Sequence, residues 1–501
     1  MKRRILVLMM VVLALLLTVS GAVAESVGTG FTYQGFLKDG GSPASGTYDF
    51  EFRLYDSPTG DLQIGNTEIR DDISVDEGLF TVELNFGGDV FGGSARWLDI
   101  NVRDGSSTGD YTQLDPRQRL MPTPLAQYAE HAPLAERVTA PAGNILTTLD
   151  SPDDFGRHTS VTIGTDGLAL TSYYDATNGA LKVTHCNDTA CSSATTTAVD
   201  SSGDVGMYTS ITIGADGLGL ISYHDATNDT LKVAHCDDTA CSSATTATLD
   251  SIGQTGRYTS ITIGFDGLGL ISYYEANDGD LKVAHCSNTA CSAATINYLD
   301  TGVSGGNVGR YTSITLGADG MGLVSYYDAT NRALKVSHCD NIICNNSTET
   351  TLDNTGDVGM YTSVTTGDDG LGLISYYDYT NGDLKVAHCN NATCSGAALA
   401  TLDSLVNVGL DASVTIGTDG LGLISYYNAT NGDLKVAHCN DTTCSGAALI
   451  TVDSTGDAGT NTSVTIGADG LPLISYYDVT NGDLKIAHCN SVFCTPYFRR
   501  R

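Results

Sequence analysis

The stretch Ser260 to Cys291, SITIGFDGLGLISYYEANDGDLKVAHCSNTAC, recurs seven times along the chain and decides its fold. Three extended runs can be read in it, separated by Asp266-Gly267 and by Asn277-Asp278-Gly279. Such residue pairs tolerate the positive φ that hairpin turns require. Each copy is therefore predicted to be a small antiparallel sheet, and an extended run after its second cysteine supplies a fourth strand. In this copy the four strands are expected at residues 258–264, 268–274, 281–285 and 293–299.

The copies repeat every 50 residues, except for one step of 53 residues that spans the Gly-rich stretch Thr301 to Arg310. An insertion at that point indicates a surface loop. Four strands in a period near 50 residues are typical of a β-propeller blade. We therefore predict a seven-bladed β-propeller over residues 144–494.

The two ends of this region indicate how the ring is closed. Six copies carry a fourth strand after their cysteines, but only residues 495–501 follow the last copy, and we interpret them as a tail. The missing strand is found at Ile145 to Asp150, ILTTLD, ahead of the first complete copy. Pairing this N-terminal outer strand into the last blade would close the propeller and protect two open edges.

The beginning of the chain indicates export. Residues 1–24 have a basic start, an apolar run and a small-residue end at Ala22-Val23-Ala24, as in a secretory signal peptide. Beyond it no stretch is apolar enough for a membrane span. Export to an oxidising compartment favours disulfides between the two cysteines that close each copy. The pairs, which include every cysteine of the chain, are Cys186/Cys191, Cys236/Cys241, Cys286/Cys291, Cys339/Cys344, Cys389/Cys394, Cys439/Cys444 and Cys489/Cys494.

These disulfides are expected to join the third and fourth strands across a hairpin. The alternative is a zinc site built from His285, Cys286 and Cys291, but zinc usually takes a tighter Cys-x2-Cys spacing and a fourth ligand. The histidine before each first cysteine is then expected to be a packed strand residue. Calcium is a weaker alternative, because the Asp-Ala-Thr-Asn-Gly-Asp type of turn departs from the EF-hand spacing. The prediction is a chain without a cofactor.

Residues 25–132 differ in composition from the repeats, because they hold most of the phenylalanines and the only tryptophan, Trp97. Apolar residues alternate with polar ones at 48–54, 80–86 and 98–102, which predicts strands with one buried and one wet face. Turn residues separate these runs. A β-sandwich of about seven strands fits, followed by a linker at 133–143.

Several motifs of this module carry a family resemblance: FTYQGFL (31–37), GTYDFEFRLYD (46–56), GLFTVELNFG (78–87), RWLDINVR (96–103) and LDPRQRLMPTPLAQYA (114–129). They resemble an N-terminal β-module that recurs in exported bacterial envelope proteins. The repeats are in turn similar to Ser-Tyr-Tyr and His-Cys containing propeller repeats of secreted bacterial proteins. The resemblance implies a bacterial surface or secreted protein, and it implies no catalytic residues.

Charge limits the partners. The formal net charge of −33 opposes nucleic acid and anionic membrane surfaces. Glycans and proteins at the cell surface remain as partners. Near one face of the predicted propeller the sequence places aromatic, carboxylate and amide groups, which together suit sugar stacking and hydrogen bonding. The candidate ligand-binding residues are Tyr208, Tyr258, Tyr311, Tyr361, Asp411, Asn461, Asp204, Asp225, Asp357, Asp378 and Asp457.

Asp411 and Asn461 interrupt the aromatic series, so a single distinct site is expected there or at Thr301 to Arg310. For the aspartates the competing explanation is structural, because Asp and Asn before a turn cap the backbone themselves. Near-identical copies argue against a catalytic centre, which needs unequal residues at one point. The sequence thus favours a secreted or surface-displayed binding or adhesion protein. A structural envelope spacer and a polysaccharide hydrolase or lyase are the alternatives.

Overall fold

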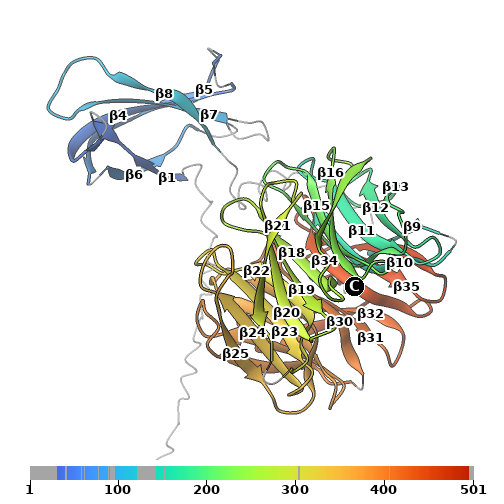
Figure 1. Ribbon diagram of the computed structural model, residues 1–501. Helices are drawn as coiled ribbons and strands as arrows, with labels where there is room; N and C mark the ends of the chain where they lie inside the picture. The colour runs from blue at the N-terminus through green and yellow to red at the C-terminus, as the bar shows by residue number, and fades with distance from the viewer. Residues whose placement is uncertain are drawn as a thin grey trace, which may run out of the picture. The chain divides into compact units, whose positions relative to one another are not determined.

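The computed structural model describes residues 31–120, apart from 40–41, 58, 61, 77, 88–89 and 91–95, and residues 143–495, apart from 152, 303–304 and 406. The chain divides into two compact units after residue 135 (Figure 1). Within the described residues both units consist of strands without helices. No helix in that part of the chain could cross a membrane. The expected signal peptide, the linker and most of the tail lie outside the described residues.

The described residues of the first unit form eight strands in three sheets. A four-stranded sheet has the order β5-β4-β7-β8, β1 pairs with β6, and β2 pairs with β3. The strands are β1 (Phe31–Phe36), β2 (Lys38–Asp39), β3 (Ser42–Pro43), β4 (Gly46–Tyr55), β5 (Gln63–Val75), β6 (Leu79–Leu84), β7 (Arg96–Asp104) and β8 (Thr112–Leu120).

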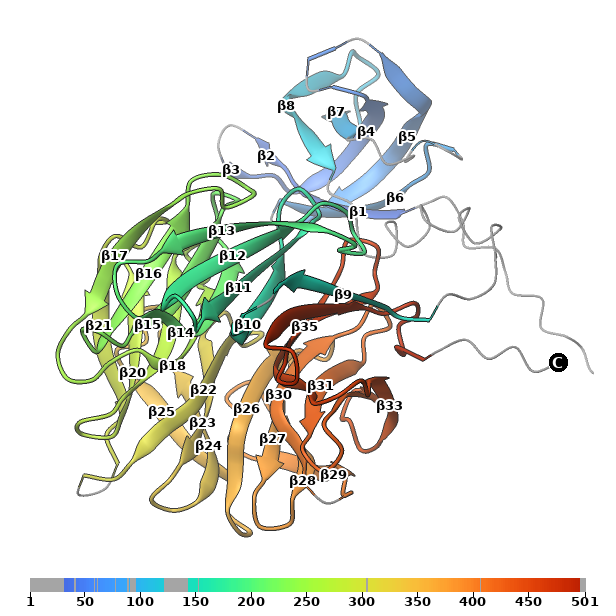
Figure 2. The ribbon, with the colours of Figure 1, turned by 90° about the vertical axis from the view of Figure 1, so that its right-hand side faces the viewer.

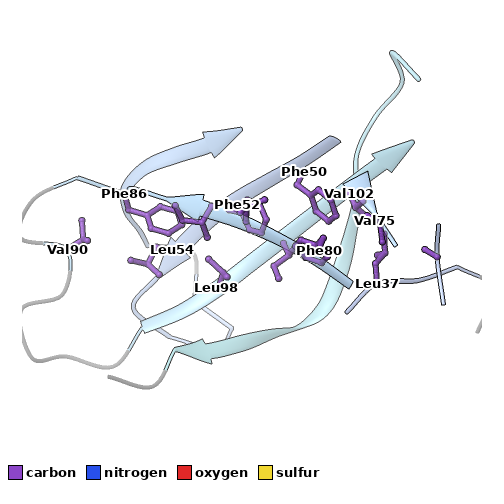
Figure 3. Packing of buried hydrophobic residues seen from close by; sticks show 14 residues of the cluster. Leu37, Phe50, Phe52, Leu54, Val75, Phe80, Phe86, Val90, Leu98 and Val102 are labelled. Carbon is purple, nitrogen blue, oxygen red and sulfur yellow. The ribbon is translucent and has the colours of Figure 1, made fainter. Parts of the chain in front are cut away.

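The apolar core of this unit lies between the four-stranded sheet and the β1-β6 pair. Phe50 and Phe52 of β4 are fully buried, and Phe50 stacks on Phe80 of β6 at 4.4 Å between ring centroids (Figure 3). Leu54, Leu98 and Phe86 extend the same cluster. The alternating apolar residues of the sequence therefore form one continuous core, as expected for strands with an apolar face.

The expectation that the other face of these strands is wet is wrong for β4 and β7. Asp49 and Asp99 are 5% and 2% exposed. Asp49 accepts a hydrogen bond from Arg103 at 3.0 Å, and Asp99 accepts one from Gln113 at 2.5 Å. Arg117, from the PRQ motif, lies over the Tyr55 ring and covers this face. Buried carboxylates with polar partners therefore occupy part of this face, whereas Glu51 and Arg53 of β4 remain partly exposed.

The second unit contains seven four-stranded antiparallel sheets, which confirms the repeated sheets expected from the sequence. We number them sheets 1 to 7 by their first strands. These are β10 (Phe155–Ile163), β14 (Val205–Ile213), β18 (Arg257–Ile263), β22 (Val308–Leu316), β26 (Val358–Thr366), β30 (Val408–Ile416) and β34 (Ala458–Ile466). The second strands are β11 (Ala169–Asp175), β15 (Gly219–Asp225), β19 (Gly269–Glu275), β23 (Gly322–Asp328), β27 (Gly372–Asp378), β31 (Gly422–Asn428) and β35 (Pro472–Asp478).

The third strands are β12 (Ala180–Cys186), β16 (Thr230–Cys236), β20 (Asp280–Cys286), β24 (Ala333–Cys339), β28 (Asp383–Cys389), β32 (Asp433–Cys439) and β36 (Asp483–His488). The fourth strands of sheets 1 to 6 are β13 (Ala194–Asp200), β17 (Ala244–Asp250), β21 (Ala294–Asp300), β25 (Ser347–Asp353), β29 (Ala397–Asp403) and β33 (Ala447–Asp453). Strand boundaries in sheet 3 agree with the sequence prediction to within about two residues.

Sheet 7 takes its fourth strand from the start of the unit. Strand β9 (Ile145–Asp150) pairs antiparallel with β36 (Figure 2). The side chain of Asn144 reinforces the junction, since its Nδ2 donates to the Cys494 carbonyl at 3.0 Å and its Oδ1 accepts from the Asn490 N–H at 3.2 Å. The pairing predicted for ILTTLD is therefore present.

Neighbouring sheets contact each other through their first strands, and the last such contact joins β34 to β10. A buried hydroxyl pair repeats at these contacts: Thr209 Oγ1 donates to Ser172 Oγ at 3.0 Å, and Thr159 Oγ1 donates to Ser475 Oγ at 2.9 Å. The second of these bonds links sheet 1 to sheet 7. The contacts thus run through all seven sheets and return to the first.

A buried Asp-Tyr-Lys group also links each sheet to the next. The aspartate that ends a fourth strand accepts hydrogen bonds from a tyrosine and a lysine of the following sheet, as Asp200 does from Tyr223 at 2.7 Å and from Lys232. Asp150 of β9 forms the same link from sheet 7 to sheet 1. The seven groups are Asp150/Tyr173/Lys182, Asp200/Tyr223/Lys232, Asp250/Tyr273/Lys282, Asp300/Tyr326/Lys335, Asp353/Tyr376/Lys385, Asp403/Tyr426/Lys435 and Asp453/Tyr476/Lys485.

All seven expected cysteine pairs are disulfide-bonded. Their placement across paired strands is wrong, however. Cys186 ends β12 and is in register with Ala194, whereas Cys191 lies in the intervening turn with φ of 51°. The disulfide closes that turn on itself, because the Cys191 N–H already donates to the Asp188 carbonyl at 3.0 Å.

The same correction applies to the second cysteine of every pair. None of these cysteines lies opposite its partner on a paired strand, as a disulfide across the hairpin would require, and each has φ between 49° and 53°. Each N–H donates to the carbonyl three residues earlier at 2.9–3.1 Å, so the chain folds back before the fourth strand begins. The corrected residues are Cys191, Cys241, Cys291, Cys344, Cys394, Cys444 and Cys494.

Candidate functional site

One position on the first strand of every sheet has an unusual backbone conformation. The seven residues at this position have φ between 50° and 56°, although none of them is glycine. They lie where the pairing between first and second strands changes register, for example between Met207 and Ser210, which is a β-bulge. We call them the axial ring: His158, Tyr208, Tyr258, Tyr311, Tyr361, Asp411 and Asn461.

Five members of the axial ring are aromatic and follow one another around it. Ring centroids are 4.5 Å apart between His158 and Tyr208, and 4.6 Å apart between each following tyrosine pair up to Tyr361. The planes of neighbouring rings are tilted by 46–51° to each other, so each ring meets the next at an angle. The stacking of a sugar on these tyrosines stays a prediction. Burial, and then the proximity of Tyr311 and Tyr208, raises the pKa of the Tyr258 hydroxyl.

The two non-aromatic members complete the circuit through the backbone. Asp411 Oδ2 accepts a hydrogen bond from the Asn461 N–H at 2.8 Å, and Asn461 Oδ1 accepts one from the His158 N–H at 3.0 Å. Sheets 6, 7 and 1 are joined in this way. The two positions that interrupt the tyrosine series therefore use their side chains partly to bridge sheets, and each retains a second polar atom.

The side chains of the axial ring have a low tendency to ionise at neutral pH. Burial, and then the charge of Arg157, lowers the pKa of His158 to about 4, so this imidazole is neutral at pH 7. Burial raises the pKa of Asp411 above its usual range. Burial and then the charge of Asp411 raise the pKa of Tyr361 to about 12. At neutral pH the ring thus offers hydroxyls, an amide, a neutral imidazole and one carboxyl group.

The axial ring surrounds a cavity of about 180 Å³. The residue after each ring member also lines it, and this residue is threonine in every sheet except sheet 6, which has Ala412. Asp411 supplies the single carboxyl group among these described lining residues. The pocket is therefore small, polar and asymmetric, and its asymmetry is concentrated in sheets 6, 7 and 1.

The other predicted ligand-binding residues lie away from this pocket in structural roles. Asp225 and Asp378 are 3% and 2% exposed, and each accepts hydrogen bonds within its own turn, from Asn228 and Asn381. A second set accepts a tyrosine hydroxyl from the preceding sheet at 2.5–2.7 Å. This set is Asp204 with Tyr174, Asp357 with Tyr327, and Asp457 with Tyr427.

The stretch that carries the insertion before sheet 4 also contains a residue that accepts a tyrosine hydroxyl. Of the Gly-rich stretch Thr301 to Arg310, residues 303 and 304 are outside the described part. Asn307 takes the place of the aspartate in the other sheets, and its Oδ1 accepts from the Tyr274 hydroxyl at 3.0 Å. The distinct site expected at this stretch stays a prediction.

The histidines beside the disulfides have a partner that the sequence analysis missed. In each sheet the histidine before the first cysteine places its Nε2 2.7–2.8 Å from the aspartate of the Asp-Gly turn, as His285 does with Asp266. The constant spacing of 19 residues between the two could have indicated this pair. The sulfurs of Cys286 and Cys291 are bonded to each other, so the alternative zinc site lacks thiolate ligands.

A larger depression of about 270 Å³ lies at the edge of sheet 3. It is lined by Asp250 and Lys282, together with the exposed side chains of Ile252 and Tyr298. The two charged groups form an ion pair at 3.1 Å. Because these groups already satisfy each other, the axial pocket remains the stronger candidate site.

In the comparison with known proteins, a family model matches part of the first unit. Residues 32–117 match a family described as a domain of unknown function (DUF8740). This region coincides with the N-terminal module recognised from its motifs, and the family description brings no activity. No curated protein matches the chain.

Solved structures match the chain at low identity. A protein of unknown function from Dyadobacter fermentans is 12% identical, covers 70% of this chain and 97% of its own, and gives a TM-score of 0.42. Hydrazine synthase of Kuenenia stuttgartiensis is 13% identical, covers 68% of this chain and 96% of its own, and gives a TM-score of 0.46. A leech intramolecular trans-sialidase is 12% identical, covers 92% of this chain and 93% of its own, and gives a TM-score of 0.39. With TM-scores below 0.5, these matches assign no activity to the chain.

Proposed function

We propose that residues 144–494 form a seven-bladed β-propeller closed by β9, and that the first unit is a β-sandwich. The propeller is supported by the seven four-stranded sheets, by the pairing of β9 with β36 and by the contact of β34 with β10. The sandwich is supported by the core shared between the four-stranded sheet and the β1-β6 pair.

The chain functions as an exported binding protein. Fourteen cysteines in seven disulfides suit an oxidising compartment outside the cytoplasm, where such bonds persist. The acidic surface implied by the net charge of −33 favours uncharged or cationic ligands. A bacterial cell surface is the location that the resemblance of the N-terminal module suggests.

The ligand is the hydroxyl-rich end of a glycan, bound in the axial pocket. The observation that carries this assignment is the axial ring itself: seven non-glycine residues hold left-handed backbone conformations that place their side chains around one polar cavity. Such conformations cost of order 1–3 kcal/mol each and tend to persist at functional sites. Phenol, amide, imidazole and carboxyl groups form the hydrogen bonds that sugar hydroxyls need.

A glycan array followed by isothermal titration calorimetry tests this function. The folded chain is expected to bind a glycan through its terminal sugar. Asp411→Asn and Tyr311→Phe should each weaken that binding by about five- to tenfold, because each removes or changes a hydrogen-bonding group worth roughly 1–1.5 kcal/mol. Asn at position 411 keeps an oxygen for the Asn461 N–H, so the fold should survive.

Asp368→Asn is the matched control, because Asp368 is an exposed residue of the β26–β27 turn outside the pocket lining. The proposal fails if the array is silent, or if the two pocket variants bind a hit as tightly as the unaltered chain. A hydrolase or lyase would instead release product from the bound glycan. With one carboxyl group in the pocket the acid and base pair of most glycosidases is incomplete, so no turnover is expected.

A further inference from the structure

The turn between the second and third strands is built in a common way in most sheets. In sheets 1, 2, 4, 5 and 7 the aspartate that ends the second strand accepts two hydrogen bonds from an asparagine three residues later. In sheet 5, Asp378 Oδ1 accepts from the Asn381 N–H at 3.1 Å, and its Oδ2 accepts from the Asn381 side-chain amide at 2.9 Å. The amide donor thus satisfies the carboxylate.

Sheet 3 departs from this arrangement, because it has Glu275 and Asp278 at the two positions. Glu275 Oε2 accepts from the Asp278 N–H at 2.9 Å, which corresponds to the backbone bond of the other turns. A carboxylate has no N–H to offer, so the side-chain amide bond is replaced by two facing carboxylates. The exchange removes a donor and adds a negative charge.

The Asp280 carboxylate is the third one at this turn, and it lies close to those of Glu275 and Asp278. One carboxylate oxygen from each of Glu275, Asp278 and Asp280 lies within 4.8 Å of the others. Glu275 and Asp280 are 2% and 6% exposed, whereas Asp278 is exposed. The Asp280 carboxylate has no hydrogen bond or ion pair within the described residues, so it is a buried polar group without a partner. Such groups in native proteins need a compensating ligand.

No protein cation occupies this position in the described part of the chain. In sheets 1, 5 and 7 the lysine of the third strand lies 3.6–3.9 Å from the aspartate of this turn. In sheet 3 the corresponding Lys282 is paired with Asp250 at 3.1 Å, and it forms no ion pair with Glu275. Burial, followed by the charges of Glu275 and Asp278, raises the pKa of Asp280. The backbone N–H groups of Gln254, Asn277 and Asp278 bond to the Glu275 carboxylate, whereas Asp278 and Asp280 have no ion pair within the described residues.

We propose that Glu275, Asp278 and Asp280 bind a calcium ion at the β19–β20 turn. Three carboxylates are the hard oxygen ligands that this cation takes, and its flexible coordination by six to eight oxygens suits an irregular turn. Asp278 is exposed at the edge of the site, so water can complete the coordination. Magnesium is disfavoured because it demands near-octahedral geometry. Sheet 3 alone combines these three carboxylates among the described residues.

Calcium titration of the full chain tests the site. After removal of metal with a chelator, isothermal titration calorimetry with CaCl2 is expected to show a binding event that Asp278→Asn weakens at least tenfold. Calcium should raise the Tm of the unaltered chain and leave that of Asp278→Asn nearly unchanged. The variant restores the asparagine that the other six turns carry at this position, so it is expected to fold, as circular dichroism would verify.

Two comparisons keep the test specific. Asp383→Asn removes the counterpart of Asp280 in sheet 5, where Asn381 already satisfies Asp378, and it should leave calcium binding unchanged. MgCl2 should produce a much weaker signal than CaCl2. The proposal is overturned if calcium neither binds nor raises the Tm, or if Asp278→Asn binds calcium as tightly as the unaltered chain. These outcomes do not depend on whether the axial pocket binds a glycan.

Discussion

Several single residues of this chain form hydrogen bonds that join one sheet to the next. Asp353 is an example: it is 2% exposed, ends β25, and accepts hydrogen bonds from Tyr376 and Lys385 of the following sheet. Burial alone would raise the pKa of this carboxyl group, but the bonds from Lys385 and Thr355 outweigh it and lower the pKa to about 2. The charged form is therefore strongly favoured in the folded chain.

Asp353→Asn is expected to lower the stability of the chain by roughly 3 kcal/mol, because it removes the carboxylate that Lys385 contacts directly and leaves this lysine only the more distant Asp378, at 3.9 Å. Urea denaturation at pH 7 measures this loss. Asp368→Asn, which alters an exposed carboxylate of sheet 5, the sheet that carries Lys385, should change stability very little. An equally stable Asp353→Asn chain would show that the buried link contributes nothing.

The same link predicts a dependence on pH. The pKa of Asp353 is about 2 in the folded chain against 3.8 for an ordinary aspartate, so its stabilising effect is complete above pH 4 and is lost as the pH falls toward 2. The difference in unfolding free energy between the unaltered chain and Asp353→Asn should accordingly shrink over this interval. A constant difference down to pH 2 would contradict the assigned pKa.

What the sequence could predict at this scale depended on local spacing. The turn glycines and the cysteine pairs are local features, and they were correctly identified. The partners of Asp353 lie in the next copy, and the left-handed conformation of Tyr311 arises from a bulge against a neighbouring strand. Neither is visible in one copy. For that reason the sequence assigned Asp225 and Asp378 to a ligand, although both cap turns.

At the scale of the element, the turn closed by a disulfide is the most regular unit of each sheet. Cys389 and Cys394 are fully buried, and the N–H of Cys394 donates to the Asn391 carbonyl inside the turn. Sequence spacing predicted the bond but placed it across two strands. The error arose because four intervening residues fit a hairpin as well as they fit a compact turn, and only the register of Cys389 with Ala397 separates the two.

Replacing one disulfide, as Cys389→Ala with Cys394→Ala, is expected to cost about 2 kcal/mol, since a loop this short gains little entropy in the reduced unfolded chain. Thermal unfolding by calorimetry measures the change. Thr393→Ala, inside the same turn, leaves the bond intact and should alter stability by much less. Loss of all folded structure in the double variant would show that the bond is essential for folding and not a modest addition.

At the scale of the whole molecule, the strand that begins the second unit completes its end. ILTTLD occupies the position of a fourth strand beside β36, and Asp150 forms with sheet 1 the same Asp-Tyr-Lys link that joins every other pair of sheets. This arrangement was predictable from sequence because the last copy lacks a strand and the first is preceded by one. The axial pocket was only partly predictable, because it exists only when all sheets meet.

Deletion of residues 144–150 should therefore affect the whole second unit. β36 would become an edge with unpaired backbone groups, and the Tyr173 and Lys182 side chains would lose Asp150. Exposed edges of this kind pair with other chains. We expect a lower Tm and self-association, measured by size-exclusion chromatography with light scattering.

Restoration of the same strand after Cys494, in a chain whose second unit begins at Ser151, should recover both properties, because Asn144 lies 3.0 Å from the Cys494 carbonyl. If deletion leaves a monomer of unchanged Tm, or if the relocated strand fails to restore it, β9 does not close the unit.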